Sequence, residues 1–471
     1  MKKNISGFLV LFIILTIAVS TMWLTAQAKD TAAEVKLKMI FTEMIENNKE
    51  NLAKDGKTLN VIGDINIEDG GKYYAVTLPE LVISEVNGDQ TQIGMIAVNA
   101  TPTDNPNNWN MAIALPTPFV KNDAEGTKIG QFNLGTQKFA GIYSVPLKNF
   151  TKLALDYRDL KFSNYEDNEI VDIEKFEVFS DLVETKDTLS GPTNIKLSDI
   201  TFADVKKNKT TTIDEVDVLV EYEGLDILAL LQNSTNLNIN KLGGVKLKAD
   251  IKDIESNFKL SRIEIEYDGE KPKNGLSDQK FKMKYNNLRP QLSADDTAKF
   301  IPQDMNIDFA FNKLPIADLI ALGVMKATSS EDNPAAALGV IQAITTLPAK
   351  MSKSGTNLDI DNIDFKNDLF DITTKGKLKA DNDSPIKIVG DIILSAKGLD
   401  KTRSAIEQKM SNSNANGKKA MAKILNQITF IKEKCDGAGG DYVCNINLSK
   451  SGQVTVNNNA INLFELISLA N

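Results

Sequence analysis

Apolar and polar residues alternate over many short stretches of this chain, and this period of two is the feature that most constrains its fold. The alternation is found at residues 160–162, 173–179, 197–202, 254–260, 263–267 and 358–365. Successive side chains of a β-strand point to opposite faces of a sheet, so each stretch predicts a strand with one dry face and one wet face. The spacing is too irregular for a solenoid with a fixed repeat. We therefore predict a mainly β fold of the α+β class, with peripheral helices and elongated, curved antiparallel sheets.

The pattern divides the chain into four parts: residues 1–28, 29–150, 151–400 and 401–471. The second part begins with a helical period, in which apolar residues recur at i, i+3 and i+4 over residues 31–54. Strands follow, among them one at residues 60–67, and Asn87-Gly88 is a strong signal for a tight hairpin. We expect this part to be a helix followed by an antiparallel meander.

The third part is expected to be a repetitive antiparallel β region that is interrupted by a helical pair near residues 315–345. The fourth part is expected to contain a second helical pair, at residues 401–410 and 418–428, and then a hairpin whose first strand includes residues 428–431. A short helix at residues 461–469 is expected to end the chain.

The N-terminus has the composition of an export signal. Lys2 and Lys3 precede an apolar run at residues 8–24, and Ala26 and Ala28 give the small-x-small pattern that signal peptidase accepts. The run is also just long enough to span a bilayer, so a retained anchor is the alternative to cleavage after Ala28. In either case the rest of the chain is expected in the periplasm, held at the inner membrane if the segment is not cleaved.

The two cysteines, Cys435 and Cys444, flank one predicted hairpin loop. In an oxidising compartment they are expected to form a structural disulfide. A redox-active pair is disfavoured, because such pairs usually have two intervening residues at a helix start, where the pKa of one thiol is lowered. The Gly-rich loop between them, residues 436–441, has too few carboxylates for a calcium site and is expected to be a flexible turn.

The composition excludes several kinds of chemistry. The chain has no histidine, which excludes Ser-His-Asp catalysis and His-ligated zinc. Its net charge of −9 disfavours nucleic acid as a partner, because nucleic acid binding requires basic surfaces.

Two short segments, Ser384-Pro385-Ile386-Lys387 and Lys450-Ser451-Gly452, resemble motifs of penicillin-binding enzymes. In those enzymes the serine lies at the start of a helix, whereas Ser384 precedes a predicted strand.

Carboxylates are frequent along the predicted strands, as at Asp359, Asp361 and Asp364 or at Glu264 and Glu266. At alternate positions of a strand they are expected to form a solvated face and not a converged acid/base pair. No phosphate-binding glycine loop is present. We therefore assign no catalytic, cofactor-binding or metal-binding residue, and expect no cofactor.

The C-terminal third has a familiar order of elements. An apolar helical segment (335–344) precedes strands near residues 360–365 and 386–394, an Ala- and Lys-rich helical stretch (401–428) follows, and the chain continues through residues 444–458 to Ile461-Asn462-Leu463-Phe464. This order, with the N-terminal anchor, resembles the YdgA-like family of bacterial envelope proteins, although Asn458 stands where a glycine is usual. The resemblance implies a periplasmic or inner-membrane protein of unknown function with no catalytic residues to assign.

We therefore expect a non-enzymatic envelope protein that acts as a scaffold or binder in envelope maintenance, with another envelope protein or a lipid as its partner. The helices at residues 316–326 and 335–344 are expected to cover the apolar side of the sheet, since apolar sheet faces normally pack. One alternative is a lipid-binding or lipid-transfer protein that uses this side as a groove. A second alternative is an enzyme that depends on a metal or on carboxylates, which would require acidic residues from distant strands to converge.

Overall fold

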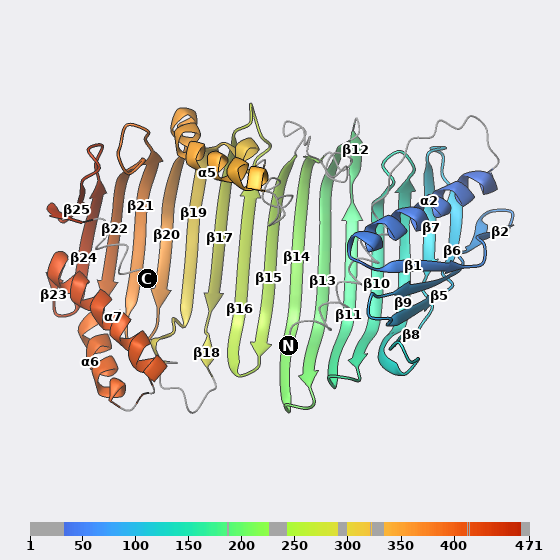
Figure 1. Ribbon diagram of the computed structural model, residues 1–471, viewed down its shortest axis with the longest axis horizontal. Coiled ribbons are helices and arrows are strands. Elements are labelled where there is room, and N and C mark those ends of the chain that lie inside the picture. The colour runs from blue at the N-terminus through green and yellow to red at the C-terminus, as the bar shows by residue number, and fades with distance from the viewer. Residues whose placement is uncertain are drawn as a thin grey trace. The chain divides into compact units, whose positions relative to one another are not determined.

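The computed structural model describes residues 33–185, 188–225, 243–290, 299–320, 322, 334–411, 413 and 415–462. Within these ranges the chain is mostly antiparallel sheet with few helices, which confirms the predicted fold class (Figure 1). The chain divides into unit 1 (residues 1–237 and 251–256) and unit 2 (residues 238–250 and 257–471). Strand β15 (Gly244–Glu255) contributes residues to both units.

Unit 1 begins with the expected helix. Its described elements are α2 (Ala33–Lys54), β1 (Thr58–Ile62), β2 (Asn66–Asp69), β3 (Tyr74–Thr77), β4 (Glu80–Ser84), β5 (Gln90–Gly94), β6 (Ala97–Pro102), β7 (Asn108–Ala114), β8 (Phe119–Asn122), β9 (Lys128–Ser144), β10 (Asn149–Asn164), β11 (Glu169–Asp181), β12 (Val183–Thr185), β13 (Thr188–Asp204) and β14 (Lys209–Leu225). Helix α2 buries Leu37, Ile40 and Phe41 on one side, as its 3.6-residue period predicts. It ends where Gly56 adopts a left-handed φ of 71°.

The meander expected before residue 150 is wrong, because β1 pairs with β4, β3 with β6, β5 with β8 and β7 with β9, in addition to the pairs between chain neighbours. The first half of β9 pairs with β8 and its second half with β7. One branch continues from β8 through β5 and β4 to β1, and the other from β7 through β6 and β3 to β2. The strand expected at residues 60–67 is divided between the branches, at Gly63, whose φ is 95°. Apolar residues of both branches and of α2 form one core.

The long strands β9, β10, β11, β13 and β14 share an irregularity at one level of the sheet. Gly135, Asp159, Glu174, Asp199 and Asp214 occupy matching positions, at which the pairing between neighbouring strands is interrupted for one residue. Asp159 and Asp199 have positive φ values of 55° and 52°, a conformation that aspartate tolerates better than most residues. On β10, β11, β13 and β14 the apolar residues on either side of this level are three positions apart, at i and i+3, and not two. Because these strands make the same change, their apolar residues stay on one side of the sheet.

A partly buried ionic contact attaches α2 to the turn between β9 and β10. Lys148, which is 8% exposed, donates a hydrogen bond to the carboxylate of Glu43 on α2. Tyr143 lies in the same region, where burial and the nearby charge of Glu43 raise the pKa of its hydroxyl. Since an unpaired buried ammonium is costly, this contact favours the docked position of the helix.

Unit 2 is a run of antiparallel strands with two helical insertions. Its described elements are β16 (Phe258–Gly269), β17 (Ser277–Asn286), β18 (Arg289–Pro290), β19 (Asp304–Leu314), α5 (Pro334–Ser354), β20 (Asn357–Lys366), β21 (Asp371–Ala380), β22 (Ile388–Lys397), α6 (Leu399–Met410), α7 (Ala415–Lys434), β23 (Asp436–Ala438), β24 (Asp441–Leu448), β25 (Val454–Val456) and β26 (Asn459–Ile461). Neighbours in the sheet follow the order β16, β17, β19, β20, β21, β22, β24, β25 and β26. Hairpins and helical insertions of this kind join strands that are adjacent in space.

The helices of unit 2 differ from those expected in their limits. Helix α5 starts at Pro334 as predicted but continues to Ser354, and it contacts β19 and β21 (Figure 1). Residues 316–320 are helical, and most of the remainder of the expected helix 316–326 lies outside the described residues. The strand expected at residues 428–431 is wrong, because helix α7 extends to Lys434. The helix expected at residues 461–469 does not begin at Ile461, because Ile461 belongs to β26. Residues 463–471 lie outside the described ranges.

Candidate functional site: the apolar face of unit 2

The register of unit 2 aligns side chains of one kind on each side of its sheet. In the pairs Ile265–Met283, Met283–Ile307 and Ile307–Ile363 an apolar residue lies beside an apolar residue on four adjacent strands. We call this side the apolar face. Its members are Ile263, Ile265, Tyr267, Phe281, Met283, Tyr285, Met305, Ile307, Phe309, Phe311, Leu358, Ile360, Ile363, Phe365, Ile372, Thr374, Leu378, Ile392 and Leu394.

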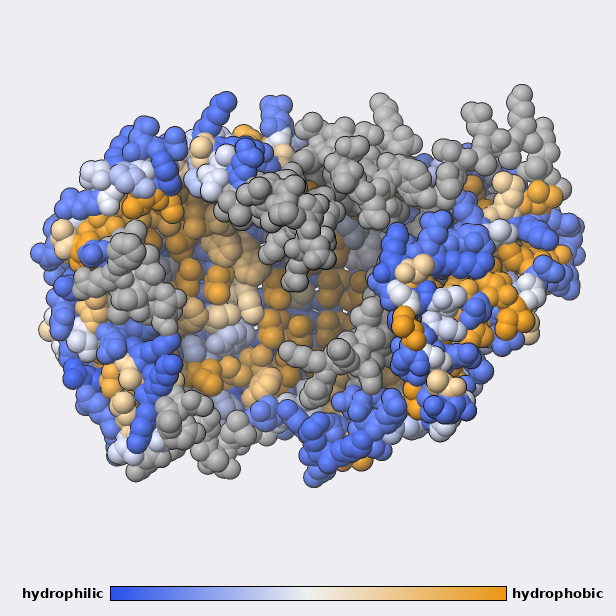
Figure 2. Space-filling view, viewed as in Figure 1, coloured by the Kyte–Doolittle hydropathy of each residue, from blue (hydrophilic) through white to orange (hydrophobic). Residues whose placement is uncertain are grey.

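Every residue of the apolar face is half-buried, and none reaches the full burial of a core side chain. Three aromatic rings lie near its centre: the ring centroids of Phe281 and Phe309 are 5.4 Å apart, and those of Phe309 and Phe311 are 5.8 Å apart. Apolar residues are visible together on these strands in Figure 2. The helical cover expected from the sequence therefore does not bury this face completely, and a broad area of aliphatic and aromatic surface remains in contact with solvent.

The tyrosine hydroxyls at the two ends of the apolar face are hydrogen-bonded. At one end Tyr267 donates to the side-chain oxygen of Gln279, whose amide nitrogen donates to Ser277 Oγ over 2.6 Å. At the other end Tyr285 donates to the backbone oxygen of Pro302 over 3.1 Å. Partial burial raises the pKa of both tyrosines, so the two hydroxyls stay neutral. The middle of the face thus offers no ionised group to a ligand.

Helices α6 and α7 cover the same side of the sheet where it continues to β22 and β24. Figure 1 shows both helices beside β24. Ala396, Cys444 and Val456 of the sheet pack there with Ile406 of α6 and Met421 of α7, and all five are buried. Side chains of the apolar face that lie nearest to the helices, such as Leu394, pack against this cluster. The apolar face is therefore bordered on one side by a packed core.

The opposite side of the same strands carries the charges, and we call it the charged face. Lys282 Nζ lies 3.0 Å from Asp308 Oδ2, and Lys280 Nζ lies 3.6 Å from Asp361 Oδ2. Lys377 Nζ lies 3.6 Å from Asp359 Oδ1. The acidic residues of the alternating stretches are thus distributed along a solvated face in pairs with lysines, which is the arrangement that the period of two predicts.

The remaining carboxylates named from the sequence are also spread over this face. Arg262 lies 3.1 Å from Glu264, and Asp364 accepts a hydrogen bond from Asn362. Glu266 is exposed. Within the described ranges, no group of three or more Cys, Asp or Glu side chains is arranged to hold a metal ion.

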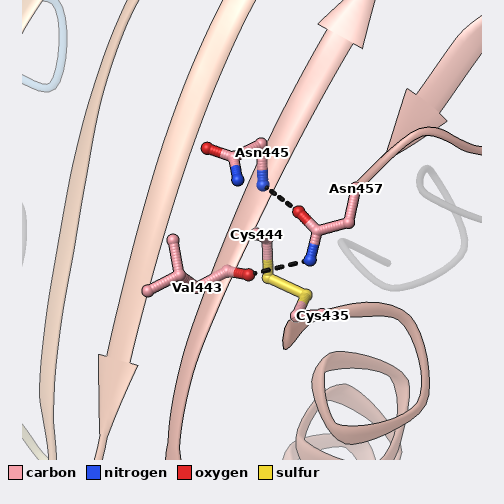
Figure 3. Close-up of a disulfide and its surroundings, with 5 residues drawn as sticks. All are labelled: Cys435, Val443, Cys444, Asn445 and Asn457. Atoms are coloured by element: carbon pink, nitrogen blue, oxygen red, sulfur yellow. Dashed lines mark hydrogen bonds between the residues drawn. A yellow bond between two sulfur atoms is a disulfide. The ribbon is translucent and has the colours of Figure 1, made fainter. Parts of the chain in front are cut away.

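The predicted disulfide between Cys435 and Cys444 is confirmed, although its first half lies at a helix end (Figure 3). Cys435 follows the last residue of α7, and its Cα lies 4.7 Å from that of Cys444 on β24. Both cysteines are buried. The bond therefore connects the covering helix directly to the sheet, within the core that borders the apolar face.

Asn457 closes the sheet beside the disulfide, and no sequence motif indicated this role. Its side-chain nitrogen donates to the backbone oxygen of Val443 over 3.0 Å, and the backbone nitrogen of Asn445 donates to its side-chain oxygen over 2.7 Å (Figure 3). The side-chain amide of Asn457 thus makes two hydrogen bonds to β24 that the backbone of a neighbouring strand would otherwise make. Asn457 and Asn458 both have positive φ values, 47° and 67°, which asparagine tolerates and which the Asn458 position requires in the tight turn.

The other sequence motifs are not assembled into a site. Ser384 is fully buried, and its hydroxyl donates a long hydrogen bond of 3.4 Å to the backbone oxygen of Ile388. Lys387 lies in the same turn, and its ammonium donates to the backbone oxygen of Asn382. Lys450 lies 3.9 Å from Asp381. Ala26 and Ala28, the predicted cleavage site, lie outside the described residues.

Among the helices that the structure describes, none is both long and apolar enough to cross a membrane. Comparison with known proteins found no matching family model, no curated relative and no solved structure.

Proposed function

We propose that unit 2 binds the acyl chain of a lipid on its apolar face, and that the protein is a lipid-binding component of a bacterial cell envelope. The observation that carries this proposal is the half-exposed, uncharged surface on strands β16 to β22, whose opposite side carries ion pairs. Soluble proteins rarely leave a large contiguous apolar patch in water unless it binds something. An occupant without hydrogen-bonding groups suits this surface, because the face offers it almost none.

The expected affinity follows from the burial of methylene groups. Full burial of one methylene contributes about 0.8 kcal/mol, so a chain that lies on an open face and buries half of its surface gains about 0.4 kcal/mol for each. A palmitate-length chain therefore gains about 6 kcal/mol before the cost of association is subtracted, so tens of micromolar is the tightest dissociation constant that this burial allows. Such weak binding suits transfer or temporary holding of a lipid better than permanent storage.

The binding test uses the full chain and a dansyl-labelled undecanoic acid, whose emission shifts to the blue in an apolar environment. Ile307→Asp introduces a charge in the middle of the apolar face, and Asn306→Asp introduces the same charge at the next residue of β19, on the charged face. We expect Ile307→Asp to weaken binding at least tenfold, because an acyl chain cannot cover the carboxylate without removing its water. Asn306→Asp should bind as the unchanged protein does.

Circular dichroism shows whether each variant keeps its sheet content, so that loss of binding is not confused with loss of fold. The proposal would be refuted if the unchanged protein failed to shift the emission of the probe. Equal weakening by the two variants would also refute it, since the apolar face would then have no special part in binding.

The placement in the envelope is a separate part of the proposal, supported by the pattern of Lys2, Lys3, the apolar run at 8–24, Ala26 and Ala28. Intact-mass spectrometry of the native protein tests it. A chain that begins at Lys29 in the periplasmic fraction supports export with cleavage, and an uncleaved chain in the membrane fraction supports a retained anchor. An uncleaved chain in the cytosolic fraction would contradict both.

A further inference from the structure

A hollow of about 570 Å³ lies in unit 1, on the side of the sheet that faces away from the core. Its floor is made by Ala112 on β7, Ala140 on β9 and Ala154 on β10, which lie beside one another in the register of the three strands. All three methyl groups are exposed. The neighbouring rows carry longer side chains, so the hollow follows from three small residues at the same level of adjacent strands.

A ring forms one wall of this hollow. Phe179 of β11 pairs with Ala154 on one side and with Asn194 on the other, and it is 56% exposed. Ile142 of β9 lines the hollow in the next row. An exposed phenylalanine next to a floor of methyl groups provides a flat apolar surface of the kind that binds the apolar side of a ring.

The rim of the hollow is polar and carries balanced charge. Lys152 Nζ lies 3.1 Å from Asp181 Oδ1, and Asn110 and Thr101 line the adjoining side. The Asp181 oxygen is shielded from solvent, and apart from the ammonium of Lys152 no described group is placed to donate a hydrogen bond to it. The rim therefore combines donors and acceptors, and the Asp181 side chain as a whole is 46% exposed, so its carboxylate can still be reached from the hollow.

We infer that this hollow is a binding site for a neutral saccharide ring. The apolar face of a sugar ring fits against Phe179 and the alanine floor, while its hydroxyl groups can donate to Asp181 and accept from Lys152 and Asn110. A ligand with net charge is disfavoured by the matched ion pair. The volume lies within the range of about 300–1,000 Å³ that is usual for small-molecule sites.

Saturation-transfer NMR on the full chain tests this inference, with maltose and N,N′-diacetylchitobiose as separate probes at millimolar concentration. We expect transfer to at least one of them, and at least a tenfold loss in Phe179→Ala, which removes the wall, and in Ala140→Leu, which fills the floor. Both positions are exposed, so the fold should be retained. Val183→Ala is the control, because Val183 is 61% exposed on β12 of the same unit and does not line the hollow.

The site is independent of the apolar face, so Ile307→Asp should leave the saccharide signal unchanged. The inference is overturned if neither saccharide receives saturation, or if Phe179→Ala and Ala140→Leu bind as well as the Val183→Ala control.

Discussion

Removal of the Cys435–Cys444 disulfide should release helix α7 from the sheet without unfolding unit 1. The bond joins residues that are 9 apart in the sequence. The chain-entropy relation for a loop of this length gives a loss of about 2.5 kcal/mol in the free energy of opening. Because about 1.4 kcal/mol corresponds to a factor of ten, local opening of this region should become about 60-fold more frequent.

Hydrogen exchange measured by mass spectrometry is the suitable assay. Tryptophan fluorescence would not report this region, because the described tryptophan, Trp109, lies in the core of unit 1. The exchange rates of peptides from α7 and β24 should rise by about 60-fold in the variant Cys435→Ala/Cys444→Ala. Chemical reduction of the unchanged protein should produce a rise of similar size, which separates the loss of the bond from any effect of the alanines.

Peptides from β9 and β10 of unit 1 provide the internal control, and their exchange should not change. The reasoning would be refuted if α7 and β24 kept their protection after reduction, since the covering helix would then be held by packing alone. An equal rise in both units would refute it as well, because the effect would then be global.

Three further outcomes are expected. Asn457→Ala should lower the free energy of unfolding of unit 2 by about 1–2 kcal/mol in urea titrations followed by circular dichroism, since it leaves two backbone groups of β24 without their partner; Asn457→Asp, which keeps the acceptor, should cost less. Leu37→Ala, at a fully buried position of α2, should cost about 2–5 kcal/mol in thermal unfolding of unit 1, whereas Val35→Ala on the exposed side of the same helix should change it little, and equal effects would contradict the packing of α2. Hydrogen bonds from Lys196 and Lys252 lower the pKa of Glu215, so its contribution to stability is present at neutral pH and is lost as the pH falls through the acidic range. The loss of stability between pH 7 and pH 3 should therefore be smaller in Glu215→Gln, and an unchanged loss would show that this carboxylate has no part in it.

The candidate sites were only partly accessible to sequence reasoning. The alternation at residues 358–365 predicts two faces, and the structure places Ile360 and Ile363 on the apolar face and Asp359 and Asp361 on the charged one. No pattern in the sequence indicates the hollow beside Phe179. Its floor consists of three alanines that are 14 to 42 residues apart and lie side by side only through the register of their strands. The role of Asn457 was equally hidden, since its amide acts on backbone groups of another strand.

The sequence by itself determined the secondary structure of most segments and the side of each strand that avoids water. Both depend on the local period of apolar residues, which does not depend on where the segment lies in the fold. Residues 33–54 repeat apolar side chains with a helical period, and the long strands repeat them with a period of two. Local signals failed at Ile428–Thr429–Phe430–Ile431, where β-branched and aromatic residues predict a strand but packing on β24 retains them in α7.

The tertiary structure alone decided which strands are neighbours and how far the apolar sides are covered. The two branches that meet at β9, the aligned irregularity from Gly135 to Asp214, and the half-exposed state of the apolar face all depend on contacts between residues distant in the chain. The pairing of strands depends on the apolar area that all strands of a sheet bury together. That area cannot be read from any single stretch of sequence.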